Sequence, residues 1–200
     1  MWSLNDYRTV FMAVGLIGVL VCWVPSVMLF ARLPGGEKFS ELYVLGPGHM
    51  AEGYPYNVRE NESYLVYLGV GNHMGDSVFY EVCVKFRNSS ESLPNATSGE
   101  ASSLPVLFVY RVFLGDGGVW EGALNFSLLN VGFDGNVSSV GRLDVNGLVS
   151  DVNKVESWDN ASSGFAYQVF VELWRYDVAA SSFGFDNRFV TLWLNVTQSF

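Results

Sequence analysis

The residue pattern with the clearest chemistry is the triplet Asn-x-Ser/Thr, whose asparagine can accept an N-linked glycan. Seven such triplets follow residue 32, where the Ser and Thr content predicts about two by chance among 13 asparagines. The excess predicts a domain exposed to a glycosylation machinery outside the cytoplasm, and an unmodified polar surface rich in Ser and Asn is the alternative. The predicted acceptors are Asn61, Asn88, Asn95, Asn125, Asn136, Asn160 and Asn195.

Residues that could catalyse a reaction are few. His49 and His73 each lie beside a predicted turn, and neither has a partner at a characteristic spacing. Glu172 and Asp177 could act as the two carboxylates of a glycosidase if they shared one cleft wall. The Gly-x-Ser-x-Gly pattern of serine hydrolases does not occur. We therefore expect exposed turn histidines and no enzymatic activity, with a histidine base as the alternative.

Metal and cofactor sites are also not expected. Two cysteines and two histidines without paired spacing exclude a zinc site by number. Cys22 lies in an apolar segment and Cys83 in the following domain, so a disulfide between them is not expected. Oxygen ligands for calcium occur at Asp144, Asn146, Asp151, Asn153 and Glu156. In an EF-hand loop glycine is the sixth residue, whereas Gly147 is the fourth residue when Asp144 is counted as the first, so an ordinary turn is favoured.

Four tryptophans could line a glycan-binding face, although packing in a core or at a sheet edge is the commoner role for such residues. They are Trp120, Trp158, Trp174 and Trp193.

An apolar segment must position the domain that carries these residues. Residues 10–31 contain no charge, and as a helix they would cover about 33 Å, enough for a hydrocarbon core of about 30 Å. We predict a cytoplasmic stub over 1–9, a transmembrane anchor over 10–31, a linker over 32–40 and an extracytoplasmic domain over 41–200. A cleaved signal peptide is the alternative, but the run is long and lacks a small-x-small site. A buried core helix is the other alternative.

Charges flanking this segment balance, so they do not orient it. The glycosylation triplets all follow it, and they predict a cytoplasmic N-terminus and an extracellular C-terminal domain in the cell membrane. From residue 33 onward, 19 acidic and 9 basic residues give a net charge of −10. Such a surface repels nucleic acid, which is therefore not an expected partner.

Alternation of apolar and polar residues predicts strands throughout the domain. In residues 77–87 it places Cys83 on a polar face with Glu81, Lys85 and Arg87. Residues 88–103 are predicted to form a long loop. In the last strand Leu192 and Leu194 should face the core, and Asn195 should face solvent, as a glycan there requires. The nine predicted strands are residues 41–45, 63–72, 77–87, 106–114, 120–133, 142–145, 154–158, 165–176 and 189–197.

Seven to nine short strands without a helical period predict a mainly β domain, an immunoglobulin-like antiparallel β-sandwich. A closed barrel is the alternative.

Several stretches carry a family resemblance. Residues 39–58, FSELYVLGPGHMAEGYPYNV, resemble the opening of an archaeal membrane-protein family that carries the domain of unknown function numbered 1616. Residues 69–73, 109–121, 170–177 and 188–197 are similar to it as well. The resemblance implies a membrane-bound archaeal protein whose sandwich lies outside the cell, and it implies no catalytic residue.

The expected protein is therefore a single-pass, glycosylated cell-surface protein that serves as an envelope or protein-interaction module. Its expected partners are the lipid bilayer, through the helix, and other cell-surface or S-layer proteins. An accessory subunit of a larger membrane complex is one alternative, and a pilin-like filament subunit is another.

Overall fold

The computed structural model describes residues 4–30, 37–160 and 163–198 of the 200-residue chain. The chain divides into two compact units, Met1–Glu37 and Lys38–Phe200.

The first unit contains one helix, α1 (Leu4–Phe30), which confirms that the apolar segment is helical up to residue 30. Residue 31 lies outside the described residues. The described side chains include Val10, Phe11, Met12 and Val14, which are exposed and point in different directions around the axis. Over the residues that the structure describes, no helix combines the length and hydropathy needed to cross a membrane.

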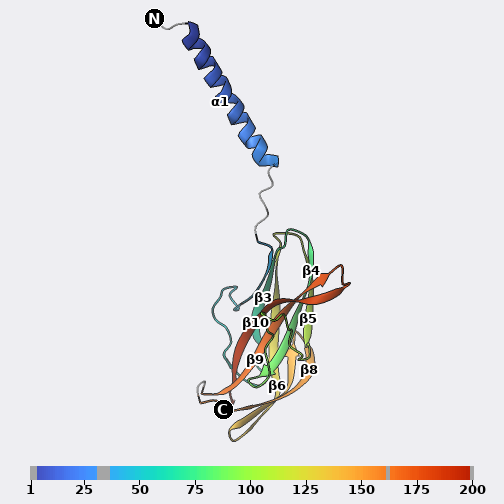
Figure 1. Ribbon diagram of the computed structural model, residues 1–200. Coiled ribbons are helices and arrows are strands. Elements are labelled where there is room, and N and C mark those ends of the chain that lie inside the picture. Colours follow the sequence, from blue (N-terminus) through green and yellow to red (C-terminus); the bar gives the residue numbers. More distant parts are fainter. Residues whose placement is uncertain (1–3, 31–36, 161–162, 199–200) are drawn as a thin grey trace. The chain divides into compact units, whose positions relative to one another are not determined.

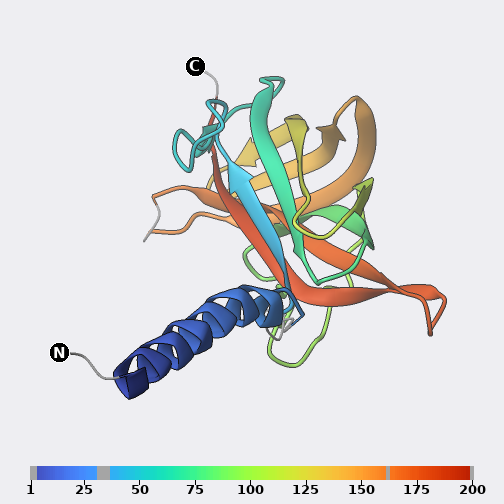
Figure 2. The same ribbon diagram turned by 90° about the horizontal axis from the view of Figure 1, so that it is seen from above.

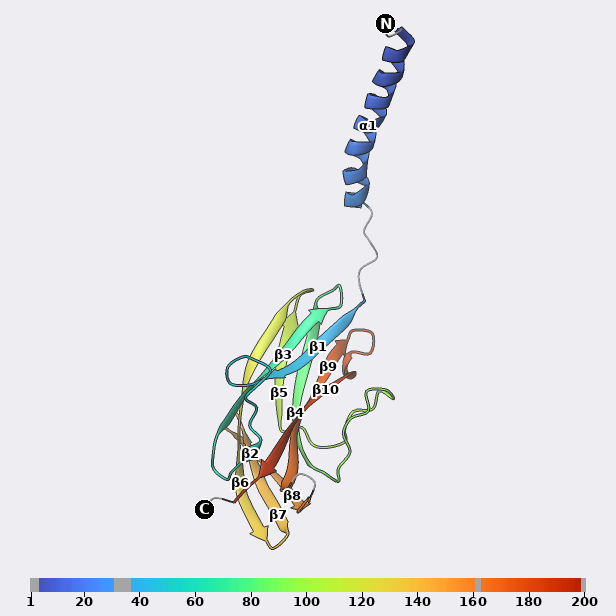
Figure 3. The ribbon, with the colours of Figure 1, turned by 90° about the vertical axis from the view of Figure 1, so that its left-hand side faces the viewer.

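The second unit is a β-sandwich of two five-stranded sheets (Figures 1, 2 and 3). One sheet has the order β1-β3-β6-β7-β8, and we call it sheet A. Its strands are β1 (Phe39–Leu45), β3 (Tyr64–His73), β6 (Val119–Asp134), β7 (Val137–Val145) and β8 (Leu148–Ser157). The other, sheet B, has the order β2-β10-β9-β4-β5. Its strands are β2 (Asn57–Val58), β10 (Ser182–Val196), β9 (Phe165–Asp177), β4 (Val78–Asn88) and β5 (Phe108–Leu114).

Neighbouring strands are antiparallel except for β2 and β10, which pair in parallel through Asn57 and Asn195. The predicted sandwich is confirmed, since two separate sheets with free edges exclude a closed barrel. It has the general architecture that immunoglobulin-like domains share. All nine predicted strands are present, and the tenth is the two-residue β2, which is too short to show an alternation.

The core lies between the sheets, as alternation along the strands requires. Leu192, Leu194 and Val196 of β10 are buried, as predicted. They pack with apolar side chains of β3, β4, β6, β7 and β9, and no described residue of α1 belongs to this core.

The strands β7 and β8 are longer than predicted because they form a hairpin over Asn146 and Gly147. Both residues have positive φ, 51° and 85°, as a two-residue type I′ turn requires. Asp144 closes the turn by accepting a hydrogen bond from the Gly147 amide at 2.7 Å. The expected turn at this place is confirmed.

The two ends of the sandwich carry different segments. Phe39, where the chain enters the sandwich, pairs with His73 at one end. At the other end lie Asn57 of β2, the C-terminal end of β10 and the start of β9 at Phe165, which pairs with Val196. Figures 1 and 3 show the start of β1 and the C-terminal end of β10 at opposite ends of the sandwich.

Burial of Leu194 predicts a measurable stability difference. Leu194→Ala should lower the free energy of unfolding by about 2–5 kcal/mol, because it leaves a cavity in the core. Leu148→Ala is the matched control, since Leu148 is 52% exposed, and it should change stability by less than about 0.5 kcal/mol. Urea unfolding of a fragment spanning residues 38–200 measures both. An equal loss of stability in the two variants would contradict the register of β10, which places Leu194 in the core.

Candidate functional site

A cleft opens on the outer face of sheet B, at the end of the sandwich away from Phe39. Its volume is about 690 Å³. It is surrounded by residues of β8, β9 and β10, and by the segments that follow β4, follow β8 and precede β2. The lining residues are Tyr56, Ser89, Glu156, Asp159, Ala166, Trp193, Leu194 and Asn195.

Two aromatic residues dominate the cleft. Trp193 is 48% exposed and Tyr56 is 47% exposed. They are brought to one edge by the pairing of β2 with β10, in which the Asn195 amide donates to the Tyr56 carbonyl at 2.7 Å. The cleft therefore combines half-exposed rings with the carboxylates of Glu156 and Asp159.

A second cavity of about 470 Å³ adjoins the first at Asn195, which lines both. Trp158 lies in this second cavity and is 44% exposed. Its ring packs edge-on against Phe165, with centroids 5.3 Å apart. Each cavity thus contains an exposed tryptophan.

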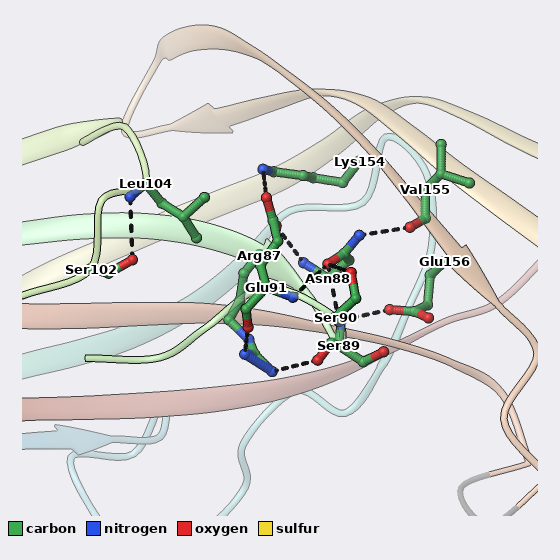
Figure 4. Close-up of polar contacts among 10 residues, drawn as sticks. All are labelled: Arg87, Asn88, Ser89, Ser90, Glu91, Ser102, Leu104, Lys154, Val155 and Glu156. Carbon is green, nitrogen blue, oxygen red and sulfur yellow. Dashed lines mark hydrogen bonds and ion pairs between the residues drawn. The ribbon is translucent and has the colours of Figure 1, made fainter. Parts of the chain in front are cut away.

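Hydrogen bonds fix the positions of Ser89 and Glu156, which line the cleft; Figure 4 shows these bonds. The Glu156 carboxylate accepts from the Ser89 amide at 2.6 Å, and the Asn88 side chain donates to the Val155 carbonyl at 2.9 Å. Lys154 forms an ion pair with Glu91. These contacts tie β8, in sheet A, to the end of β4, in sheet B.

The segment between β4 and β5, residues 89–107, covers the middle of the outer face of sheet B. It is held there by a buried ion pair between Lys85 and Glu172, 2.8 Å apart. Lys85 also donates to the Ser102 carbonyl at 2.7 Å, and the Ser102 amide donates to Glu172 at 2.7 Å. Trp174 donates to the same carboxylate at 3.0 Å. Both charges are therefore hydrogen-bonded as well as paired, which a buried ion pair requires.

The polar face predicted on β4 is present, but the covering segment buries it. Lys85, Arg87 and Cys83 do point away from the core, but each is at most 6% exposed. Arg87 donates to the carbonyl groups of Glu91 and Ser89 (Figure 4). Alternation predicts which side of the sheet a residue occupies, and it says nothing of a loop that returns over that side.

Three outward residues form a row across β4, β9 and β10, next to the start of the covering segment. Arg87 pairs with Gln168, and Gln168 pairs with Trp193. Arg87 and Gln168 are buried, whereas Trp193 is open to the cleft. Gln168 Oε1 is buried and has no hydrogen-bond partner among the described residues.

Burial also decides the chemistry of Cys83. Desolvation, assisted by the nearby carboxylates of Glu81 and Glu172, raises the pKa of the Cys83 thiol to about 12. The thiolate form, which is the nucleophile, is therefore scarce at neutral pH.

The possible catalytic carboxylates do not form a pair. Glu172 is buried against Lys85, and Asp177, five residues along the same strand, points to the opposite side. Asp177 accepts hydrogen bonds from the amides of Ala179 and Ala180 in the β9–β10 turn. The two carboxylates thus cannot act across one cleft wall.

The two histidines have partners that the sequence did not indicate. His49 lies 3.1 Å from a carboxylate oxygen of Glu121, and its ring stacks on Tyr67 at 3.7 Å. His73 lies 3.5 Å from a carboxylate oxygen of Glu41 and stacks on Phe39 at 4.7 Å. These contacts hold the surface of sheet A together.

Among the described residues, no group of three or more His, Cys, Asp or Glu side chains could hold a metal ion. Asn146, one of the possible calcium ligands, is hydrogen-bonded within the protein instead. Its side chain accepts a hydrogen bond from the Asn125 amide and donates one to the Tyr110 hydroxyl.

Most predicted glycan acceptors are accessible. Asn61, Asn95, Asn125, Asn136 and Asn160 are exposed, and Asn88 is half-buried. Residue 162, the third of the Asn160 triplet, lies outside the described residues.

Asn195 differs from the other acceptors, and the prediction that it faces solvent is wrong. It is 8% exposed, donates to Asn57 Oδ1 at 2.9 Å and accepts from the Phe165 amide at 3.0 Å. The β2 segment and the start of β9 bury a face that alternation alone would leave open.

The four tryptophans divide into two pairs. Trp120 packs against the core, and Trp174 is bonded to Glu172. Trp158 and Trp193 line the cavities. The sequence indicated all four tryptophans as possible ligand contacts. It could not show which of them are packed and which line a cavity, because that depends on which segments cover each sheet.

The ion pair predicts a large effect of one substitution. Glu172→Gln should lower the free energy of unfolding by about 3–5 kcal/mol, because it leaves the Lys85 charge buried without a counter-charge. The control is Arg111→Gln, which breaks a pair with Glu81 in which Arg111 is 68% exposed, and it should cost at most about 1 kcal/mol. Urea unfolding at neutral pH compares the two. A Glu172→Gln variant as stable as the control would show that the pair does not fix the segment.

Comparison with solved structures yields neighbours of low similarity. The CARDB domain of the PF1109 protein from Pyrococcus furiosus, in complex with di-metal ions, is 12% identical, with a TM-score of 0.42 over 84% of this chain and 95% of that chain. A β-glucosidase from Listeria innocua is 11% identical, with a TM-score of 0.44 over 82% of this chain, and the match spans only 16% of the enzyme. These values are too low for either structure to indicate a function.

A comparison with curated proteins yields no match. A comparison with models of protein families does yield one. Residues 33–137 match the family described as "Domain of unknown function (DUF1616)". The stretches at 170–177 and 188–197, which also suggested this family, lie beyond the matched region. Since the match covers more than half of the 200 residues, the chain belongs to the DUF1616 family.

Proposed function

We propose that this chain is a non-enzymatic, single-pass membrane protein that displays its sandwich on the outer surface of an archaeal cell, as an interaction module of the envelope. The observation that carries the proposal is the order of features along the chain. A charge-free run of 22 residues comes first, and all seven glycosylation triplets follow it.

Support for the anchor comes from the composition of the whole segment over residues 10–31. Its helix has no polar stripe that would rest against water, and such a helix is typical of a membrane span. At about 1.5 Å per residue, the 27 residues of α1 extend about 40 Å. Charged residues occur only outside the run, with Arg8 before it and Arg32 after it.

Support for an interaction module comes from the sandwich itself. Of the residues that could catalyse a reaction, Glu172 is buried against Lys85 and Asp177 is bonded within a turn. The two histidines lie apart at the surface of sheet A, each beside a carboxylate. The cleft, by contrast, is open and lies at the end of the sandwich opposite Phe39, where the chain enters. A partner could reach it without passing the point of attachment. Other proteins of the envelope, such as those of an S-layer, are the proposed partners of the displayed surface.

Insertion of the anchor into the membrane can be tested by introducing one charged residue. Leu16→Arg should move most of the protein out of the membrane fraction, because an arginine near the bilayer centre costs about 2.5–3.5 kcal/mol on the insertion scale. Leu16→Ala, which stays apolar, should remain in the membrane. Extraction with alkaline carbonate followed by immunoblotting measures both. Equal retention of the two variants would contradict a membrane-spanning segment.

Topology can be tested by the glycans. Asn61, Asn95 and Asn125 should carry glycan in the native source, because they are exposed, whereas the buried Asn195 should be unoccupied. Glycopeptide mass spectrometry measures occupancy at each position. Unmodified peptides at all exposed acceptors, in a source that glycosylates its other surface proteins, would contradict an extracellular domain.

A further inference from the structure

The lining of the cleft combines two kinds of group. Tyr56 and Trp193 offer ring faces that are nearly half exposed, and such faces bind flat apolar surfaces. Glu156 and Asp159 also line this cavity, and a carboxylate is a group that accepts strong hydrogen bonds from hydroxyl groups. A pyranose ring has both complementary features, since its C–H face is apolar and its rim carries hydroxyl groups.

The charge of the site narrows the class of ligand. Among the described residues that line the two cavities there is no lysine or arginine. The chain from residue 33 onward carries a net charge of −10. Sulfated sugars, uronic acids and phosphates would be repelled, so a neutral saccharide fits best.

The shape of the site indicates a ligand longer than one sugar unit. The cavities of about 690 Å³ and 470 Å³ meet at Asn195, with Trp193 in one and Trp158 in the other. A compact cation would instead need several rings arranged around one point, within about 6 Å of the charge. Tryptophans divided between two adjoining cavities are better suited to successive units of a chain.

We propose that these cavities form one binding site for a neutral oligosaccharide, with Trp193 and Trp158 stacking on different sugar units. The proposal rests on the proposed function, to which it adds the chemical group that the displayed surface would bind on its envelope partners: a neutral glycan. Glu156 has two roles: it lines the cleft, and its carboxylate accepts hydrogen bonds from the amides of Ser89 (Figure 4) and Ser157.

The test is isothermal titration calorimetry on the full chain made in bacteria, so that its own asparagines carry no glycan. A polyoxyethylene detergent keeps the anchor soluble, because a glycoside detergent would compete for the site. The probes are cellotriose, mannotriose and chitotriose. At least one should bind, and Trp193→Ala should weaken it by about tenfold or more, equivalent to about 1.4 kcal/mol. Trp158→Ala should weaken the trisaccharide more than the corresponding monosaccharide.

The matched control is Phe113→Ala, which removes an aromatic side chain that is 69% exposed and lies outside both cavities. It should leave binding unchanged. Tyr56→Ala provides a second variant outside any strand in case Trp193→Ala fails to fold, and it should also weaken binding.

Three results would overturn the proposal. They are the absence of binding for all three probes, binding unaffected by loss of Trp193 and of Tyr56, and Trp193-dependent binding of tetramethylammonium without saccharide binding. Membrane insertion and glycan occupancy are measured separately, so failure of this site is distinguishable from failure of the proposed topology.

Discussion

The domain depends on a pair of opposite charges being buried together. Lys85 and Glu172 lie on adjacent strands of sheet B, at most 3% exposed in their side chains. Taking either charge out of water alone would cost several kcal/mol, so each requires the other and the hydrogen bonds that surround them. The Ser102 backbone supplies two of these bonds. The charges can therefore be buried only if the segment over residues 89–107 lies against the sheet.

This constraint extends to the cleft. Once the segment lies against sheet B, its first residue, Ser89, is close enough to β8 to donate to Glu156. That bond joins the two sheets at the end of the sandwich and forms a wall beside Trp193. The outer face of sheet B is thus divided into a covered middle, where polar groups are paired, and an open end, where aromatic rings are exposed. A ligand site at the open end is a consequence of how the middle is covered.

The sequence predicted the sheets well because they depend on local alternation. The strands ending at Arg87 and beginning at Phe165 were predicted within a residue or two, and the core positions of Leu192 and Leu194 were correct. It failed where distant segments meet. Asn195 and Cys83 lie on the side that alternation assigns, but both are covered by parts of the chain more than a few residues away.

In the cleft, too, local features were predicted from the sequence and contacts between distant segments were not. Trp158 and Trp193 were recognised as possible ligand contacts, yet Tyr56 was not, because nothing local marks the two-residue strand that brings it to Trp193. Glu156 was considered only as a calcium ligand. Its position beside Ser89 depends on a contact across 67 residues of sequence, which residue types and spacing do not encode.

The central claim is that residues 89–107 form a fixed part of the sandwich rather than a solvated loop. Amide hydrogen exchange at Ser102, followed by nuclear magnetic resonance, tests this claim most directly, because that amide donates to the buried Glu172 carboxylate. If the claim is correct, Ser102 exchanges as slowly as the paired amides of β4 and β9, and only through opening of the domain. Exchange as fast as that of Ser92, an exposed residue of the same segment, would show that the segment lifts away and would contradict the account.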